Sequence, residues 1–238
     1  MVPYIIINGK SSRTIPGLLI QSLPPITKPK VRTNIEEIEG VDGDFATVLG
    51  YAAYDKQFSI GLHGDFDIDD IIQYFDSSGR ITFSNEIDKY YKYAIYDQID
   101  FNKLVRFRTA TVKAHVQPFK YSIEEPAIKT LNTLDNTVFS MSVKNKGNIY
   151  SKPRLEIVGS GTITVYLQGY ILFSISLSHN EKIIIDADTM NATDADGNYL
   201  NRKVTGDYND FRFKPGQNEI TFTGRLQSAK IENYSRWI

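Results

Sequence analysis

The sequence predicts a mainly β protein built from two domains. It contains 15 Tyr and 13 Phe among its 238 residues, and aromatic and β-branched side chains favour strands over helices. Short segments with strand composition also recur along the chain, separated by polar or glycine-bearing turns. With 41% hydrophobic residues, a chain of this length can form either one large β-rich domain or two domains of ordinary size.

The first half of the chain contains one segment with the pattern of a helix, Asp67–Ser77. Its apolar residues recur at i, i+3, i+4 and i+7, which places them on one helical face: Ile68, Ile71, Ile72 and Phe75. Asp65 or Asp67 can cap its start, and Asp69 and Asp70 lie in the first turn, where the helix dipole favours negative charge. We expect a short amphipathic helix packed on a sheet.

Two further features complete the expected N-terminal domain. Lys28–Glu39 and Phe45–Leu62 flank an acidic, glycine-bearing turn at Gly40–Asp44, which predicts a long β-hairpin that projects as an arm. Other segments rich in aromatic and β-branched residues are expected as strands: Arg80–Phe83, Tyr90–Asp97 and Leu104–Gln117.

A boundary is expected between Pro118 and about Leu134, where proline and acidic residues interrupt the pattern, so we divide the chain into domains 1–130 and 131–238. The second domain contains seven short strand-like segments: Thr137–Val143, Arg154–Val158, Gly161–Leu167, Tyr170–Leu177, Lys182–Asp186, Glu219–Thr223 and Lys230–Tyr234. Turns are expected at Gly159–Gly161, at Gln168-Gly169 and at Pro215-Gly216. This spacing predicts an antiparallel β-sandwich or jelly roll.

Composition narrows the possible functions. The formal net charge is −1 and neither half is basic, which argues against electrostatic or sequence-specific binding of nucleic acid. Cysteine is absent, which excludes disulfides and thiolate metal sites. The N-terminus lacks the pattern of a signal peptide, and no apolar run reaches the length of a membrane span. We therefore expect a protein made in the cytoplasm and not inserted in a membrane.

The candidate catalytic residues do not form a recognisable constellation. The three histidines, His63, His115 and His179, are far apart in the sequence. Ser160 lies in Gly159-Ser160-Gly161, but a nucleophile elbow needs glycine two residues before and two after the serine, and Val158 and Thr162 stand there. A tight hairpin turn explains Ser160 better.

Acidic residues also give no clear catalytic or metal site. Asp194–Asn198 resembles part of a calcium loop, but Ala192 and Lys203 occupy the first and twelfth positions, where an EF-hand needs a carboxylate. The acids around the expected helix, including Asp76, are explained by capping and solvation. A pair of glycosidase carboxylates would depend on the fold and has no sequence motif. We predict no catalytic residue, no metal and no cofactor.

Binding of carbohydrate remains an alternative function, because jelly-roll sandwiches often bind sugars. Four aromatic residues of the second domain could stack on a sugar ring: Tyr166, Tyr170, Phe173 and Trp237. Packing in a core or in a subunit interface explains such residues more simply.

A family resemblance gives a more specific hypothesis. The first half contains a series of short matches in a characteristic order: Leu49–Tyr51, Ile60–Leu62, Tyr74-Phe75, Ile81–Ser84, Ile87–Tyr93, Tyr96–Phe101, Phe107–Val112 and Gln117–Tyr121. The second half continues the series: Asn145–Pro153, Ile157–Ile163, Ile185-Asp186, Gly206-Asp207 and Lys214–Ile220. Together they resemble the distal tail protein (Dit) family of siphophages that infect Gram-positive bacteria.

The resemblance implies an N-terminal β-sandwich or split-barrel belt domain and a C-terminal galectin-like β-sandwich. It implies a homo-hexameric ring at the distal tip of the virion's tail, through whose channel DNA passes. The expected partners are the tail tube (major tail) protein, the tail-associated fibre or lysin protein, and receptor-binding or baseplate proteins. The expected hairpin arm would be an element between subunits.

Two departures limit what the resemblance implies about host recognition. Some family members carry an inserted carbohydrate-binding domain, whereas the longest irregular stretch here, Ala187–Phe211, has only the length of a loop. Galectins bind sugar with a His/Asn/Arg motif and a stacking Trp, which His179–Lys182 does not reproduce. We expect a compact, non-enzymatic hub whose host recognition is done by other proteins.

Overall fold

The computed structural model describes residues 2–40, 42–124, 126–132 and 138–238. The chain forms two compact units, Met1–Ile123 together with Ile238, and Glu124–Trp237. The sequence placed the domain boundary between residues 130 and 131. That position lies inside β10 (Ala127–Asn132), which pairs with β16 (Gly216–Asn233) of the second unit.

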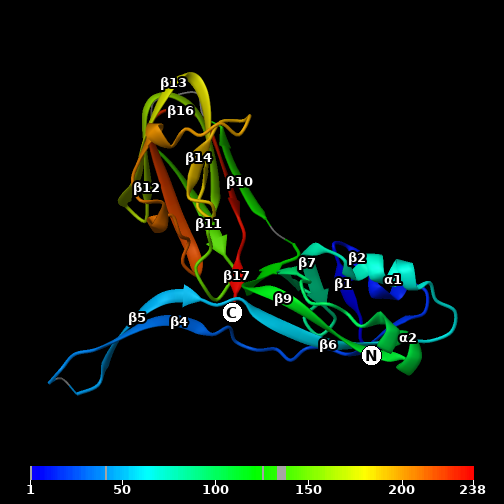
Figure 1. Ribbon diagram of the computed structural model, residues 1–238. Coiled ribbons are helices and arrows are strands. Elements are labelled where there is room, and N and C mark those ends of the chain that lie inside the picture. The colour runs from blue at the N-terminus through cyan, green and yellow to red at the C-terminus, as the bar shows by residue number, and fades with distance from the viewer. Residues whose placement is uncertain (1, 41, 125, 133–137) are drawn as a thin grey trace. The chain divides into compact units, whose positions relative to one another are not determined.

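The first unit is built on an antiparallel sheet with the strand order β2-β1-β7-β8-β9-β6-β3 (Figure 1). Its strands are β1 (Ile5–Ile7), β2 (Lys10–Ser11), β3 (Leu18–Ser22), β6 (Tyr54–Leu62), β7 (Ser78–Phe83), β8 (Lys89–Ala94) and β9 (Thr109–Ser122). Buried residues alternate with exposed ones along β6 and β9, as expected for strands with one face on a core.

The expected helix is present as α1 (Ile68–Phe75). Asp67 caps it, because its side chain accepts a hydrogen bond of 2.9 Å from the backbone N–H of Asp69. Phe75 is buried and its ring lies 6.3 Å from that of Phe58 on β6. Ile72, expected on the buried face, is exposed, so that face is narrower than the sequence predicted.

A second helix, α2 (Phe101–Phe107), corrects the prediction that Leu104–Gln117 forms one strand. Asp100 caps α2 by accepting a hydrogen bond of 2.8 Å from the backbone N–H of Lys103. Arg108 ends it in the left-handed conformation, with φ of 57°. In the described part of the chain, no helix is long and apolar enough to cross a membrane.

The expected hairpin is confirmed for its outer part only. β4 (Val31–Glu37) and β5 (Asp44–Tyr51) pair as a separate two-stranded sheet. The rest of the expected second strand is β6, which pairs with β3 and β9 in the main sheet. The expected turn at Gly40–Asp44 includes Val41, which lies outside the described residues.

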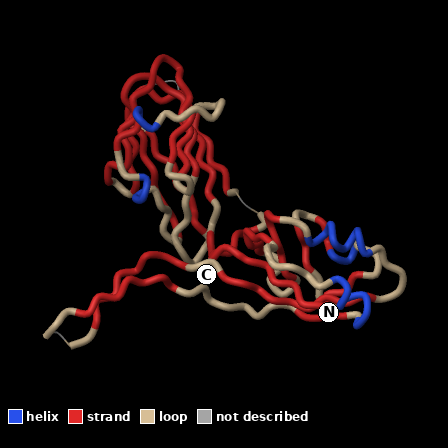
Figure 2. Tube along the Cα trace, viewed as in Figure 1, coloured by secondary structure: helices blue, strands red, loops and turns tan. Residues whose placement is uncertain are grey.

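The second unit is a β-sandwich made by three long strands that each contribute to both layers: β12 (Arg154–Leu167), β13 (Tyr170–Asp186) and β16. One layer contains their segments next to β10 and β14 (Asn191–Thr193), and the other contains their segments next to β11 (Phe139–Asn145) and β15 (Val204–Thr205). Side chains from both layers form a single core. Figure 2 shows the long strands as continuous segments.

Six of the seven expected short strands in this unit are therefore halves of three longer strands, and one expected turn is wrong. Gly159–Gly161 is not a hairpin turn but a register shift within β12, opposite a second shift in β16. A bulge lets a strand bend from one layer into the other, which a tight turn would not do. The seventh expected strand corresponds to β11, and its first residue, Thr137, lies outside the described residues.

Candidate assembly interface

The three histidines occupy separate surface positions. His115 on β9 stands directly opposite Asp55 on β6, and its Nδ1 lies 2.8 Å from an oxygen of that carboxylate. His63 and His179 are exposed. Among the described residues no group of three or more His, Cys, Asp or Glu side chains could hold a metal ion.

The serine and calcium-loop candidates take part in local hydrogen bonds. Ser160 accepts a hydrogen bond of 2.9 Å from the backbone N–H of Asn180 across the β12–β13 bulge. Asp194 accepts hydrogen bonds from the backbone N–H groups of Asp196 and Asn198. A further hydrogen bond from the Asn198 side chain lowers the pKa of Asp194 below its ordinary value. Lys203 lies against the carboxylate of Glu181.

The four aromatic candidates for sugar stacking differ in how far their side chains are exposed. Phe173 is fully buried, with its ring 5.5 Å from the rings of both Tyr208 and Phe211, so it cannot stack on a ligand. Tyr166 and Trp237 are half-buried. Tyr170 is 81% exposed.

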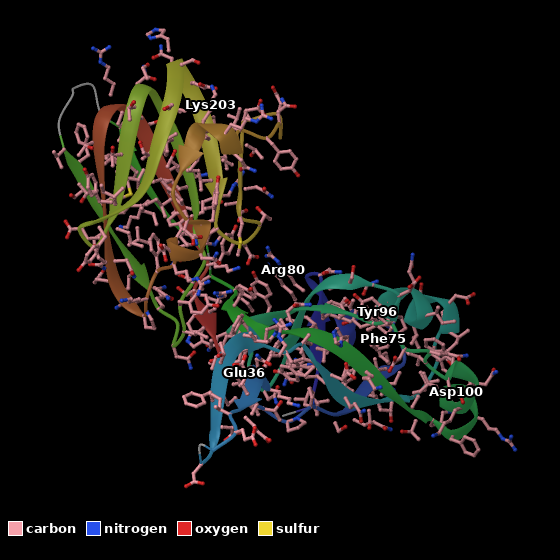
Figure 3. The ribbon with its side chains drawn as sticks, turned by 60° about the vertical axis from the view of Figure 1, so that its left-hand side comes forward. Glu36, Phe75, Arg80, Tyr96, Asp100 and Lys203 are labelled. Carbon is pink, nitrogen blue, oxygen red and sulfur yellow. The ribbon has the colours of Figure 1, made fainter. Side chains whose placement is uncertain are left out.

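A shallow open depression of about 440 Å³ lies on the first unit beside His115. Arg80, Lys92 and Tyr96 are among its lining residues (Figure 3). The Arg80 guanidinium lies 4.7 Å from the ring centroid of Tyr90, and Lys92 lies 5.1 Å from that of Tyr121. These cations therefore already interact with aromatic rings of the same sheet.

The candidate assembly element is the β4–β5 hairpin, residues 31–51, which we call the arm. Large apolar side chains on it are between 50 and 65% exposed: Ile35, Ile38, Phe45, Val48 and Leu49. Ile35 pairs across the ladder with Ala46 and Glu36 with Phe45, so these neighbouring pairs point to opposite faces. The arm therefore exposes apolar side chains on both faces, as an element that pairs with another chain does.

The root of the arm, residues 24–30, is fixed to the first unit by three side chains that donate to its carbonyl oxygens. Asn85 donates to Pro24 at 3.2 Å and Lys56 to Pro25 at 2.9 Å. The Tyr54 hydroxyl lies 3.5 Å from the carbonyl oxygen of Thr27. A proline-containing segment with its carbonyl groups bonded in this way gives the arm a defined exit from the sheet.

A buried polar network supports the root. Lys56 is 3% exposed, and burial lowers its pKa while the nearby Glu86 opposes that change. Glu86 forms an ion pair of 2.6 Å with Lys120 and accepts a hydrogen bond of 2.8 Å from the Tyr91 hydroxyl. Burial, and then the bond to Glu86, raise the pKa of Tyr91.

Charge is unevenly distributed along the arm. Residues 36–40 and 42–44, which we call the acidic tip, contain five Asp and Glu residues and no Lys or Arg. Glu36, labelled in Figure 3, accepts a hydrogen bond of 2.9 Å from the Asn34 amide. The root and the first residues of the arm include the cations Lys28, Lys30 and Arg32. The first unit has 14 Lys and Arg against 15 Asp and Glu, so without the acidic tip it would carry an excess of cations.

A second exposed surface lies on α2, and the sequence interpretation missed it. It consists of the cations Lys103, Arg106 and Arg108 and of the side chains Val105 and Phe107, which are 42 and 60% exposed. We call this set the α2 surface. A signal for it was present, because residues 101–123 contain five Lys and Arg and no acid.

Comparison with solved structures identifies the fold. The SPP1 Dit protein (gp 19.1), described as a paradigm of the hub adsorption apparatus in phages infecting Gram-positive bacteria, matches with a TM-score of 0.67. The two are 16% identical, and the match covers 100% of both chains. A chain of the phage P2 baseplate in its activated conformation with Ca matches with a TM-score of 0.52 and 12% identity, over 99% of this chain and 98% of that chain. No family model and no curated protein matches the sequence. The expected fold class is confirmed.

Proposed function

We propose that this chain, which has the fold of the SPP1 Dit hub protein, is a structural subunit of a phage tail and not an enzyme. Its copies form a homo-hexameric ring at the distal end of a siphophage tail. The observation that carries the proposal is the fold likeness over the whole of both chains. Fold alone does not fix function, so the exposed arm is a necessary second support.

The arm supports a ring because it leaves backbone and apolar groups of one copy available to another. An extended hairpin can add main-chain hydrogen bonds to a neighbouring subunit. When such a contact is head-to-tail and its rotation closes, the product is a ring. In this proposal the first unit forms the belt of the ring, and DNA passes through its channel without sequence recognition.

The ring would join the tail tube protein to the tail-associated fibre or lysin protein and to baseplate or receptor-binding proteins. The protein would therefore be located in the virion, at the distal tip of the tail. We assign carbohydrate recognition to those partners, since Phe173 is buried and only Tyr170 among the aromatic candidates is largely exposed.

Light scattering coupled to size-exclusion chromatography tests this proposal, together with negative-stain electron microscopy. We expect a mass about six times that of the 27.0 kDa chain, and six-fold rings with a central opening, from the protein alone or with its tail partners. A monomer at every concentration that also fails to associate with tail tube or fibre proteins would contradict the proposal.

A further inference from the structure

We propose that the acidic tip of the arm binds the α2 surface of a second copy of this chain. This inference rests on the proposed ring and specifies which surfaces meet in it. The tip contributes Glu36, Glu37 and Ile38, and the α2 surface contributes Lys103 and Arg106.

Charge complementarity is the first argument. The eight residues of the tip contain five acids and no cation, whereas residues 101–123 contain five cations and no acid. Two of these cations are already paired, Lys113 with Asp97 at 2.7 Å and Lys120 with Glu86 at 2.6 Å. The other three lie on the α2 surface, and none of them forms an ion pair with any described residue. Opposite charges across an interface steer encounter and fix its register.

Apolar complementarity is the second argument. The tip and the adjoining end of the arm expose Ile35, Ile38 and Phe45, and the α2 surface exposes Val105 and Phe107. The tip therefore combines large apolar side chains with acids, and the α2 surface combines them with cations, next to the helix cap Asp100. Apolar area buried at the centre supplies the affinity of such a contact, and the surrounding charges supply its specificity.

The partner is a second copy of this chain, because every copy carries one acidic tip and one α2 surface. Two tips repel one another, as do two α2 surfaces, so the favoured contact is between different surfaces of two copies. That contact is head-to-tail and can repeat around a closed ring. A strand rises about 3.3 Å per residue, so Glu37, at the far end of β4, lies about 20 Å from Val31. This reach suits a contact with a neighbouring subunit.

Charge reversal in two separate variants tests the contact. One variant carries Glu36→Lys and Glu37→Lys, and the other carries Lys103→Glu and Arg106→Glu. Each alone should raise the concentration at half-assembly by about tenfold or more, because attractive pairs become repulsive. An equimolar mixture should regain assembly, since each reversed tip then meets a reversed α2 surface and each unchanged tip an unchanged one. Native mass spectrometry should find equal numbers of the two chains in each ring.

Control variants reverse one charge of each sign elsewhere on the first unit. Asp76→Lys and Lys10→Glu alter exposed residues outside both surfaces and should leave half-assembly unchanged within about twofold, as surface substitutions usually do. Three results would overturn the inference while leaving the proposed ring intact. Either the reversal variants assemble like the unmodified chain, or both are impaired and their mixture does not recover. Loss of binding to a tail partner with an intact ring would also overturn it.

Cross-linking provides a measurement that does not need a stable ring, and the absence of native cysteine gives it a clean background. A chain with Ile38→Cys mixed with a chain with Phe107→Cys should form, on mild oxidation, a disulfide-linked dimer of twice 27.0 kDa. Ile87→Cys replaces Phe107→Cys in the control, because Ile87 is exposed but lies outside the α2 surface. Equal cross-linking with Phe107→Cys and Ile87→Cys would count against the contact.

Discussion

Lys56 Nζ donates a hydrogen bond of 2.9 Å to the carbonyl oxygen of Pro25, although the Lys56 side chain is almost completely buried. Burying an ammonium group costs free energy unless hydrogen bonds and opposite charges compensate. Here the compensation comes from the root of the arm and from Glu86. The stability of the first unit is thereby linked to the position from which its arm projects.

Replacing Lys56 with methionine should therefore lower the free energy of unfolding of the first unit by about 1–2 kcal/mol, because the Pro25 carbonyl loses its donor while the packing volume is kept. Urea denaturation measures the change. Lys10→Met, at an exposed position, serves as the control and should change stability by less than about 0.5 kcal/mol. A gain in stability for Lys56→Met would mean that the cost of burying the ammonium outweighs the bond to the root.

Glu86→Gln should have a larger effect than Lys56→Met. The substitution keeps the volume but removes the charge that pairs with Lys120 at 2.6 Å, so that buried ammonium loses its ion-pair partner. Breaking one side of a buried ion pair typically costs about 3 kcal/mol or more. Glu36→Gln on the exposed arm is the matched control, and equal unfolding midpoints for the two variants in urea would contradict this account.

Local periodicity was sufficient to predict several elements. The repeat of Ile68, Ile71 and Phe75 identified α1, and the acidic glycine turn identified the arm. In the second unit six of the seven expected segments correspond to halves of β12, β13 and β16. These features depend on nearby residues, which is why a sequence pattern can reveal them.

Features that depend on distant residues were not predictable in the same way. Whether Gly159–Gly161 turns the chain or bends one strand is decided by its partners on β13 and β16. Helix α2 has a single fully buried apolar residue, Leu104, which is too little for a periodic signal. The sequence predicted the acidic tip as part of a turn. The α2 surface could be recognised only from the structure, because its segment was expected to be a strand.

Gly224→Ala should destabilise the second unit by about 2–4 kcal/mol, because two effects add. Its φ is +113°, and an added Cβ would lie 2.4 Å from the carbonyl oxygen of Thr162, where β16 passes β12. Gly216→Ala is the control, with φ of +96° and no atom within 4 Å of the added Cβ, so it should cost only about 1 kcal/mol of backbone strain. Thermal unfolding distinguishes the two, and similar losses would show that the steric contact has no effect.

Alkaline pH should destabilise the first unit. Burial raises the pKa values of Tyr54, Tyr74, Tyr91 and Tyr93 above the ordinary value of 10.0. The folded state therefore binds more protons than the unfolded state above that pH, so the stability that these groups contribute is complete below about pH 10 and is lost as pH rises. Lys56, whose pKa is lowered, acts in the opposite direction but is one group against four.

Tyrosinate absorbance followed together with circular dichroism tests this pH dependence. These four tyrosines, of which Tyr74, Tyr91 and Tyr93 are buried and Tyr54 is partly buried, should ionise together with the loss of β structure. Ionisation of these four tyrosines near pH 10, with the fold unchanged, would contradict the prediction.

Asp100 gives a prediction that separates the shape of the α2 surface from its charge. Asp100→Ala removes the acceptor for the Lys103 backbone N–H, which should cost about 1 kcal/mol of stability and loosen α2. Association of copies should weaken as a result. Asp100→Asn keeps a capping oxygen but removes a negative charge beside Lys103, so the acidic tip of a neighbour should bind as well as before or more tightly. Half-assembly concentrations measured by light scattering compare the two variants, and weaker association of Asp100→Asn with unchanged stability would show that the tip does not bind α2 through its positive charge.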